Sequence, residues 1–195
     1  MAKKVIIGVV AVGVLAGAWY LFQLQRETAR WQQAKEIDDE ASFYEKDGPN
    51  SKMRFVSVID APLDKVQAAL WQVERSAEIV ENISRSKLVK QEGNVKVVEV
   101  HLQPLNLPLQ YYTMEFTFFP DEHRVQFKTV DSNTQDITGA YQLEASPDGT
   151  RTKIVYDATG KDKVSVPVPE SVMEGASKQT YVNTVRGITK VAKSE

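Results

Sequence analysis

Short runs in which apolar and polar side chains alternate are the feature that most limits what this sequence can fold into. Alternation with a period of two predicts strands with one buried face, and it occurs in residues 87–90, 95–102, 111–119, 124–130, 138–145 and 152–159. The segments between most of these runs are short, as in the turn Gln91-Glu92-Gly93-Asn94. Because parallel neighbours need crossovers of about a dozen residues or more, such connections exclude parallel pairing.

A strand and two short helical pieces are predicted before this region. Residues 54–59 have the β-branched and aromatic composition of a strand. Asp60 and Pro62 then indicate a helix start, with Asp60 as the capping side chain and Pro62 in the first turn. Apolar residues follow at helical spacing, at Leu63, Val66, Leu70 and Val73. A second helical or irregular piece is expected over residues 77–83.

The chain returns to a helical pattern after the strands. Pro167 and Pro169 end the strand region, and residues 171–192 place apolar side chains largely on one side of a helix. The order predicts an α+β fold in which a curved antiparallel sheet wraps around the C-terminal helix and buries its apolar face. Such a grip favours a cavity between sheet and helix.

The N-terminal segment differs from the rest. Residues 5–22 carry no charge and would span about 27 Å as a helix, against roughly 30 Å for a hydrocarbon core. Lys3 and Lys4 precede the run, and aromatic residues end it, at Trp19, Tyr20 and Phe22. One transmembrane anchor is expected. The alternative is a signal peptide cleaved after Ala16-Gly17-Ala18, but the apolar run continues past that site.

The predicted organisation has three parts. Residues 1–22 form the transmembrane anchor or signal peptide, residues 23–51 a helical stalk and linker, and residues 52–195 the folded domain, with turn residues at the boundary. The basic residues on the two sides of the span are nearly balanced, and a short basic N-terminus usually stays in the cytoplasm. We therefore expect a single-pass protein of the cell membrane with an extracytoplasmic domain.

Reactive chemistry is scarce in the composition. Lysine and arginine number 24 against 26 acidic residues, a net charge of -2, so no nucleic-acid partner is expected. Cysteine is absent and only two histidines occur, which we expect at the surface: His101 on an outer sheet face and His123 in an acidic turn. No catalytic residue, metal ligand or cofactor is predicted. Binding is favoured over catalysis, and the oligomeric state is left open.

Particular residues carry a family resemblance. They are Val58-Ile59-Asp60-Ala61-Pro62, Gly139-Ala140-Tyr141-Gln142-Leu143, the run from Pro147 to Tyr156, and the prolines before the last helix. Over residues 53–190 the chain resembles the START-like superfamily, also called the polyketide cyclase or SRPBCC group. The resemblance implies the helix-grip fold but no particular activity, because the group includes lipid and sterol carriers, quinone-binding proteins, aromatase/cyclases and ring-hydroxylase subunits. The Cys/His iron ligands of the hydroxylases are missing, so no metal role is implied.

The strand alternation also selects candidate ligand-binding residues. Those expected to face the helix across the cavity are Val98, Val100, Leu102, Tyr112, Met114, Phe116, Phe118, Phe127, Tyr141, Tyr156 and Met173. Tyr112, Tyr141 and Tyr156 would supply orienting hydroxyls. The alternative for each residue is that it simply fills a core. Residues 102–109 could form a lip at the cavity mouth, touch a membrane, or pack on the end of the domain.

Three functions are compatible with these residues. The first is a membrane-tethered domain that binds a hydrophobic ligand, such as a lipid, a quinone or a related isoprenoid. The second is a cyclase-type enzyme acting on a polyketide-like substrate, which needs an ionisable group in the cavity. Glu99 and Glu115 alternate outward, although a register slip of one residue would turn them inward. The third is a membrane-attached protein-interaction module with a filled core.

Overall fold

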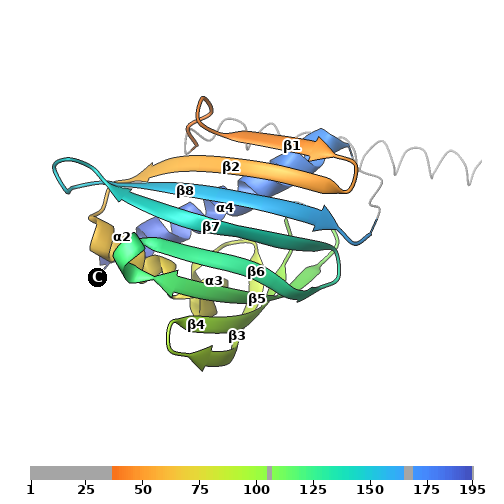
Figure 1. Ribbon diagram of the computed structural model, residues 1–195, viewed down its shortest axis with the longest axis horizontal. Coiled ribbons are helices and arrows are strands. Elements are labelled where there is room, and N and C mark those ends of the chain that lie inside the picture. Colours follow the sequence, from red (N-terminus) through yellow and green to blue (C-terminus); the bar gives the residue numbers. More distant parts are fainter. Residues whose placement is uncertain (1–36, 105–106, 165–168, 195) are drawn as a thin grey trace, which may run out of the picture.

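Eight strands form one antiparallel sheet, and the C-terminal helix lies across one of its faces (Figure 1). The structure is a computed structural model that describes residues 37–104, 107–164 and 169–194. In chain order the elements are β1 (Phe43–Asp47), β2 (Asn50–Ile59), α2 (Leu63–Leu70), η1 (Val73–Arg75), α3 (Ser76–Ile79), β3 (Ile83–Glu92), β4 (Val95–Leu102), β5 (Gln110–Phe119), η2 (Pro120–Glu122), β6 (Arg124–Ser132), β7 (Gln135–Ala145), β8 (Thr152–Asp162) and α4 (Glu170–Ser194).

The strand order in the sheet is β1-β2-β8-β7-β6-β5-β4-β3. All neighbours from β3 to β8 along the chain are joined by short connections and pair antiparallel, and β2 closes onto β8. The predicted α+β helix-grip fold is confirmed by this arrangement. Since α4 covers one face, we call that face inner and the opposite face outer.

Two local predictions need correction. Residues 43–51 were expected to be linker, but β1 pairs with β2 from Phe43 opposite Arg54 to Asp47 opposite Asn50. The turn residues at Gly48 and Pro49 therefore form a hairpin within the sheet. Asp60 was expected to cap α2, but Pro62 occupies the N-cap position without a side-chain hydrogen bond. Proline fits there because its fixed φ suits the entry to a helix.

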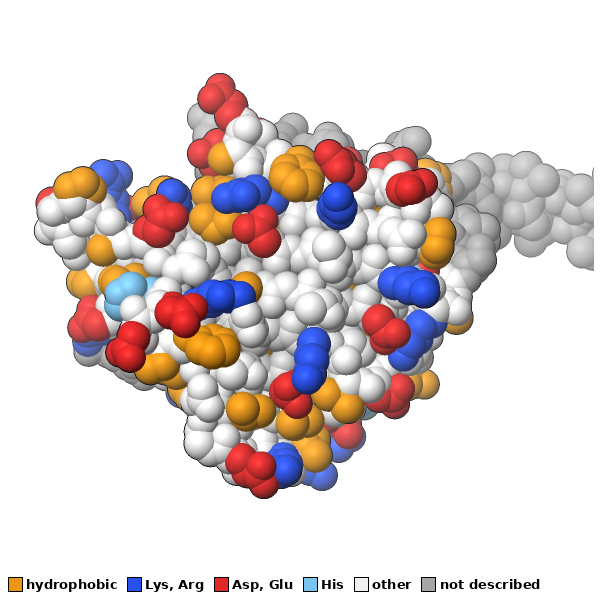
Figure 2. All heavy atoms as spheres, viewed as in Figure 1, with side chains coloured by type: hydrophobic (Ala, Val, Ile, Leu, Met, Phe, Trp, Pro, Cys, Tyr) orange, Lys and Arg blue, Asp and Glu red, His pale blue; other side chains and the backbone are white. Residues whose placement is uncertain are grey.

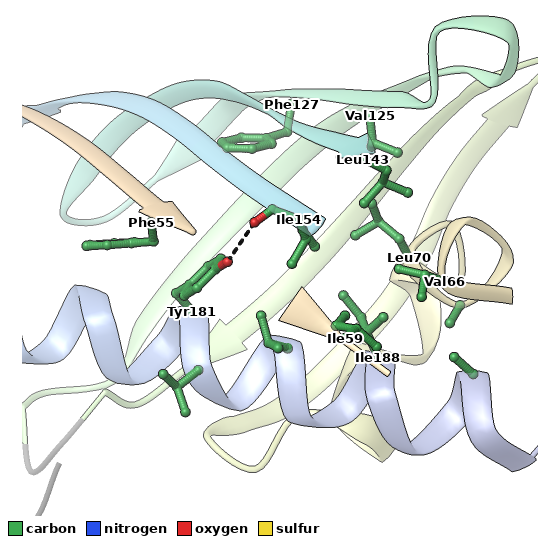
Figure 3. Packing of buried hydrophobic residues seen from close by; sticks show 14 of the residues in the cluster. Phe55, Ile59, Val66, Leu70, Val125, Phe127, Leu143, Ile154, Tyr181 and Ile188 are labelled. Atoms are coloured by element: carbon green, nitrogen blue, oxygen red, sulfur yellow. Dashed lines mark hydrogen bonds between the residues drawn. The ribbon is translucent and has the colours of Figure 1, made fainter. Parts of the chain in front are cut away.

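The packed core lies between the sheet and the C-terminal half of α4 (Figure 3). Phe55, Ile154 and Val66 have no exposed surface, and Ile188 of α4 is almost as buried. The Tyr181 hydroxyl donates a hydrogen bond to the carbonyl oxygen of Ile154 at 3.2 Å, which ties α4 to β8. Burying side chains of this size stabilises the fold by roughly 1.5–3 kcal/mol each, so this half of α4 anchors the helix to the sheet.

A glycine lets α4 approach α3 closely. A Cβ atom built on Gly187 would lie only 2.2 Å from the carbonyl oxygen of Ile79. Any other residue would force the two backbones apart, because the obstructing atom belongs to the main chain. The close approach positions α3, and with it one wall of the cavity described below.

Within residues 37–104, 107–164 and 169–194, no helix is long and apolar enough to cross a membrane. The predicted span at residues 5–22 and the stalk over residues 23–36 lie outside the described residues.

Candidate functional site

A two-lobed cavity lies between the inner face of the sheet and α4. We call the lobe of about 160 Å³ the mouth lobe; its wall includes Pro108, Val164 and Met173. The inner lobe, of about 170 Å³, is walled by α2, η1, α3 and the strands β4 and β5. The lobes lie against each other, because they share the lining residues Leu102, Tyr112, Ile137, Tyr141, Thr180 and Thr184.

The side chains of α4 explain why this end of the interface stays hollow. Between residues 173 and 184 the helix presents small or hydroxyl-bearing side chains to the mouth lobe, among them Ala176, Ser177, Thr180 and Thr184. Thr180 and Thr184 turn their hydroxyls back to helix carbonyls four residues earlier, at 3.0 and 2.8 Å. Short side chains whose polar atoms are already paired leave the space towards the sheet unfilled.

The lining carries almost no charge. No charged residue borders the inner lobe, and Asp162 is the one charged residue bordering the mouth lobe among the described residues. Asp162 is paired with Lys46, whose Nζ lies 2.5 Å from its Oδ2. Since an unpaired ion is costly to bury, the cavity suits an apolar ligand without net charge.

Four tyrosines line the cavity, and the hydroxyl of one of them, Tyr181, is already bonded to the carbonyl oxygen of Ile154. The Tyr112 hydroxyl lies 3.0 Å from Gln110 Oε1 and 3.0 Å from Thr134 Oγ1, so its hydrogen-bonding capacity is used. The hydroxyls of Tyr141 and Tyr156 have no hydrogen-bond partner among the described residues. Burial raises the pKa of both phenols well above the ordinary value, so both remain neutral donors at physiological pH.

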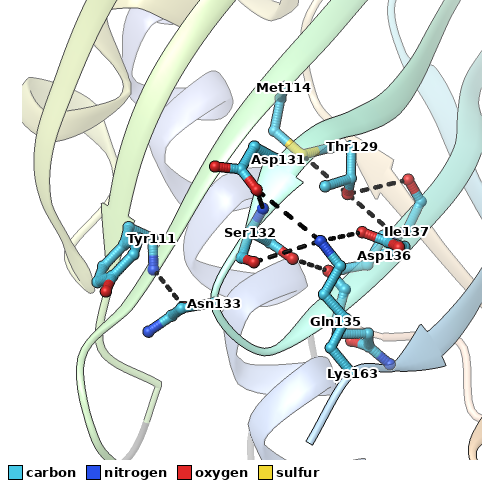
Figure 4. Close-up of polar contacts among 10 residues, drawn as sticks. All are labelled: Tyr111, Met114, Thr129, Asp131, Ser132, Asn133, Gln135, Asp136, Ile137 and Lys163. Carbon is cyan, nitrogen blue, oxygen red and sulfur yellow. Dashed lines mark hydrogen bonds and ion pairs between the residues drawn. The ribbon is translucent and has the colours of Figure 1, made fainter.

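Polar contacts brace the end of the sheet beside the mouth lobe (Figure 4). Lys163 Nζ lies 2.9 Å from Asp136 Oδ1 and donates to the carbonyl oxygen of Ser132 at 3.3 Å. The Ser132 hydroxyl donates to the carbonyl oxygen of Gln135 at 2.7 Å, across the β6–β7 hairpin. These bonds hold Thr134 and Gln135, which line the mouth lobe.

The loop before β5 closes another side of the mouth lobe. Leu107 is buried against Val172 and Ala176 of α4, whereas Leu109 is exposed. Of the three expectations for this loop, Leu107 agrees with packing on the end of the domain. Leu107 also lines the mouth lobe and is therefore part of the cavity wall. Leu105 and Asn106 lie outside the described residues.

The structure brings most of the predicted ligand-binding residues together. Those that line one or both lobes are Val100, Leu102, Tyr112, Met114, Phe116, Tyr141, Tyr156 and Met173. Whether they contact a ligand stays a prediction.

Three predicted residues lie elsewhere for reasons of packing. Val98 is fully buried beside Val73 in a small separate cluster, and Phe118 stacks on Trp71 with ring centroids 5.0 Å apart. The Phe127 ring occupies the space that a side chain at position 139 would fill, since a Cβ on Gly139 would lie 2.7 Å from it. Phe127 is therefore core and lines neither lobe.

Several lining residues were not predicted. Ile137 lies on the same face of β7 as Tyr141, four positions before it, so the period-two pattern includes it. It was missed because the predicted strand began at residue 138, whereas β7 begins at Gln135. Thr184 follows Thr180 by one helical turn and could have been found in the same way. Ile79, Val80 and Ile83 carried no comparable signal, because only the tertiary fold places α3 against the inner lobe.

The outer face is polar by comparison (Figure 2). A shallow hollow of about 710 Å³ lies over β1, β2 and β5 to β8, and charged residues line it, including Lys52, Arg124 and Asp157. Glu115 pairs there with Lys128 at 2.8 Å, and Glu99 lies 3.4 Å from both Arg85 and His101. Both carboxylates thus point away from the cavity, as the alternation predicts.

The two histidines are held by neighbours outside the cavity. His101 packs its ring against Tyr111. His123 has a positive φ of 51° after η2, and its Nδ1 lies 2.8 Å from Gln67 Oε1. Among the described residues, no group of His, Asp and Glu side chains is arranged to hold a metal ion.

Solved structures with similar folds come from several sources. The Zhui aromatase/cyclase from Streptomyces is 15% identical, covers 74% of this chain and 94% of its own, and gives a TM-score of 0.65. A protein from Thermus thermophilus gives 0.64 at 14% identity, over 73% of this chain and 97% of that one. A START superfamily protein from Mycobacterium smegmatis gives 0.59 at 8% identity, with 74% and 99% covered. Identities this low establish a shared fold only.

The sequence itself carries the family assignment. No curated protein matches the chain. The family model described as polyketide cyclase / dehydrase and lipid transport matches residues 51–193, which span the sheet from β2 onward, the cavity and α4. This chain therefore belongs to the polyketide cyclase / dehydrase and lipid transport family.

Proposed function

We propose that the domain binds a hydrophobic small molecule, such as a lipid, a quinone or a related isoprenoid, between the sheet and α4. The two-lobed, nearly uncharged cavity carries this proposal, because ligand sites are concave and mostly apolar with a few placed polar groups. The family description, which includes lipid transport, supports the same class of ligand.

The cavity favours binding over a cyclase-type reaction on a polyketide-like substrate. Acid–base catalysis needs an ionisable group within reach of the substrate. Glu99 and Glu115 lie on the outer face in ion pairs, and Asp162 is paired with Lys46 at the mouth. A hollow of this kind also argues against an interaction module with a filled core.

Filling the cavity tests the proposal. Thr184 borders both lobes, so Thr184→Leu should abolish retention of a co-purified hydrophobic molecule, measured by native mass spectrometry of the full-length protein after mild extraction. Thr138→Leu makes the same change on the exposed outer face and should leave retention unchanged. A wild-type protein without bound hydrophobic molecule and without uptake of a fluorescent lipid would refute the proposal, as would equal retention in both variants.

We also propose that residues 5–22 tether this domain to the cell membrane, with the domain on the extracytoplasmic side. The support is the uncharged apolar run with its flanking lysines and terminal aromatic residues. A tether would raise the effective concentration of a domain beside a membrane-soluble ligand.

Fractionation tests the tether. The full-length protein should stay with membranes through alkaline carbonate washing and keep an intact N-terminus by mass. A mature chain beginning at Trp19 would instead identify a cleaved signal peptide. Protease added to sealed spheroplasts should digest the domain, and protection would reverse the orientation.

A further inference from the structure

Two tyrosines whose hydroxyls have no partner in the described part of the chain lie side by side in the cavity wall. Tyr141 of β7 and Tyr156 of β8 are directly opposite each other in the strand register, and their ring centroids are 5.1 Å apart. Both line the mouth lobe, and Tyr141 lines the inner lobe as well. The pair therefore sits where the two lobes meet.

The side chains packed around these two rings are aromatic and limit the hydrogen-bond partners that the hydroxyls can have. Phe127 packs against both rings, at 5.5 Å from Tyr141 and 5.4 Å from Tyr156. Phe55 stacks on Tyr156 at 5.9 Å. Aromatic side chains of this kind offer no acceptor atom of ordinary strength, so the protein wall leaves both O–H groups unsatisfied.

Both hydroxyls still have accessible surface. In the described part of the chain, Asn82 Oδ1 is the one fully buried side-chain polar atom without a partner. The Tyr141 and Tyr156 hydroxyls also lack partners, so their oxygens must retain surface, and that surface faces the cavity that both residues line. Since unpaired polar groups in a low-dielectric site are costly, a guest that accepts hydrogen bonds here would satisfy them.

The charge of the lining limits the guest further. A carboxylate or phosphate would need a cationic partner to offset its desolvation, and no Lys, Arg or His borders either lobe among the described residues. Asp162 at the mouth is paired with Lys46 and provides no cation for an anionic ligand. The ligand should therefore accept hydrogen bonds without carrying a negative charge.

We propose that the cavity binds a neutral apolar molecule through a carbonyl oxygen that accepts hydrogen bonds from the Tyr141 and Tyr156 hydroxyls. The proposal rests on the function proposed above and narrows its ligand from hydrophobic molecules in general to neutral carbonyl compounds. Fatty-acid anions and plain hydrocarbons are excluded as preferred ligands.

Three probes of similar size and shape separate these classes. Menadione has two ring carbonyls, 2-methylnaphthalene lacks them, and 2-naphthoate carries a charge. The chain has no cysteine that a quinone could alkylate. Equilibrium dialysis with the full-length wild-type protein should show menadione bound about tenfold or more tighter than 2-methylnaphthalene, corresponding to about 1.4 kcal/mol, and 2-naphthoate bound most weakly.

The variants assign the preference to the two hydroxyls. The double variant Tyr141→Phe/Tyr156→Phe should bind 2-methylnaphthalene as the wild type does and lose the tenfold preference for menadione. Tyr111→Phe is the matched control, because Tyr111 is exposed and lines neither lobe, and it should keep the preference. Retained hydrocarbon binding shows that each variant is folded, and uptake by the N-terminal segment cancels because all variants share it.

The outcomes distinguish the two proposals. Equal affinity of wild type for menadione and 2-methylnaphthalene, or strongest binding of 2-naphthoate, would overturn the carbonyl proposal and leave hydrophobic ligand binding standing. The carbonyl proposal would also be overturned if Tyr111→Phe lost the preference as fully as the double variant. Failure of all three probes to bind would count against the cavity as a ligand site altogether.

Discussion

The two halves of α4 face the same sheet and pack against it differently. The C-terminal half carries Val185, Val191 and Ala192, which are buried against the sheet and α2. The N-terminal half presents Ala176, Ser177 and Thr180, and the mouth lobe of the cavity lies between it and the sheet. One half therefore supplies stability, and the other supplies an accessible apolar surface.

This difference shows how a helix-grip domain can be both stable and hollow. Packed interiors reach the density of organic crystals, and empty space forfeits contacts. The interface can leave one end open because the other end is closely packed, to the point that Gly187 meets the backbone of α3. Substitutions of similar size at the two ends should therefore change the free energy of unfolding by different amounts.

Removing an aromatic ring should give the largest difference in stability between a change in the packed core and a change in the cavity wall. Phe55 has no exposed surface and packs against Tyr156 and Tyr181, so Phe55→Ala should lower the free energy of unfolding by roughly 3–5 kcal/mol. Phe116 borders the inner lobe, and Phe116→Ala should cost clearly less, because its ring has fewer partner atoms to lose, while ligand retention falls. Urea denaturation and a binding assay measure both. Equal losses with unchanged binding would reject Phe116 as cavity wall.

The cavity tyrosines should make the domain sensitive to alkali. Burial raises the pKa of Tyr141 and Tyr156 above the ordinary value of 10.0, and burial with nearby carboxylates raises that of Tyr44 to about 12. A raised folded pKa means that the stability is complete below pH 10 and falls above it, as the unfolded chain ionises first.

The expected size follows from linkage. Each such tyrosine lowers the free energy of unfolding by about 1 kcal/mol between pH 10 and pH 11, so urea midpoints of the wild type should fall over this interval. The Tyr141→Phe/Tyr156→Phe variant should lose about 2 kcal/mol less over this interval. Parallel pH profiles for both proteins would show that these phenols ionise freely in the folded state.

A single methyl group should be enough to disturb the packed end. Gly187→Ala places Cβ 2.2 Å from the Ile79 carbonyl oxygen, and overpacking of this kind costs roughly 1–3 kcal/mol. That cost should exceed the gain of about 1 kcal/mol in helix propensity. Thr184→Leu adds more atoms at the open end and should change thermal stability less. A stabilised Gly187→Ala protein would contradict the close approach of α3 and α4.

The outer face should give the smallest effect. Glu115 and Lys128 form a partly exposed ion pair, and such pairs contribute about 0–1 kcal/mol. Glu115→Gln should therefore lower stability by less than about 1 kcal/mol and leave ligand binding unchanged. A large loss of binding would connect Glu115 to the cavity and revive the cyclase interpretation.

Local pattern was sufficient to predict the sheet and much of the cavity wall. Alternation placed Tyr112 and Met114 on one face and Glu115 on the other, as observed. Alternation failed at Phe127, which it places on the same face as Tyr141. Because Gly139 has no side chain, the Phe127 ring fills the space beside it and becomes part of the core. Likewise β1 was missed, since its short sequence carries turn residues at its end that suggest a linker.

The sequence by itself determined the antiparallel sheet, the long C-terminal helix and the scarcity of ionisable groups suited to catalysis, because these depend on residue type and on spacing along the chain. Only the tertiary structure decided that, over the residues it describes, the Tyr141 and Tyr156 hydroxyls have no hydrogen-bond partner while the Tyr112 hydroxyl has two. It also decided that α3 forms the wall of the inner lobe. Hydrogen-bond satisfaction and cavity volume depend on which distant segments meet, and spacing along one chain does not specify those encounters.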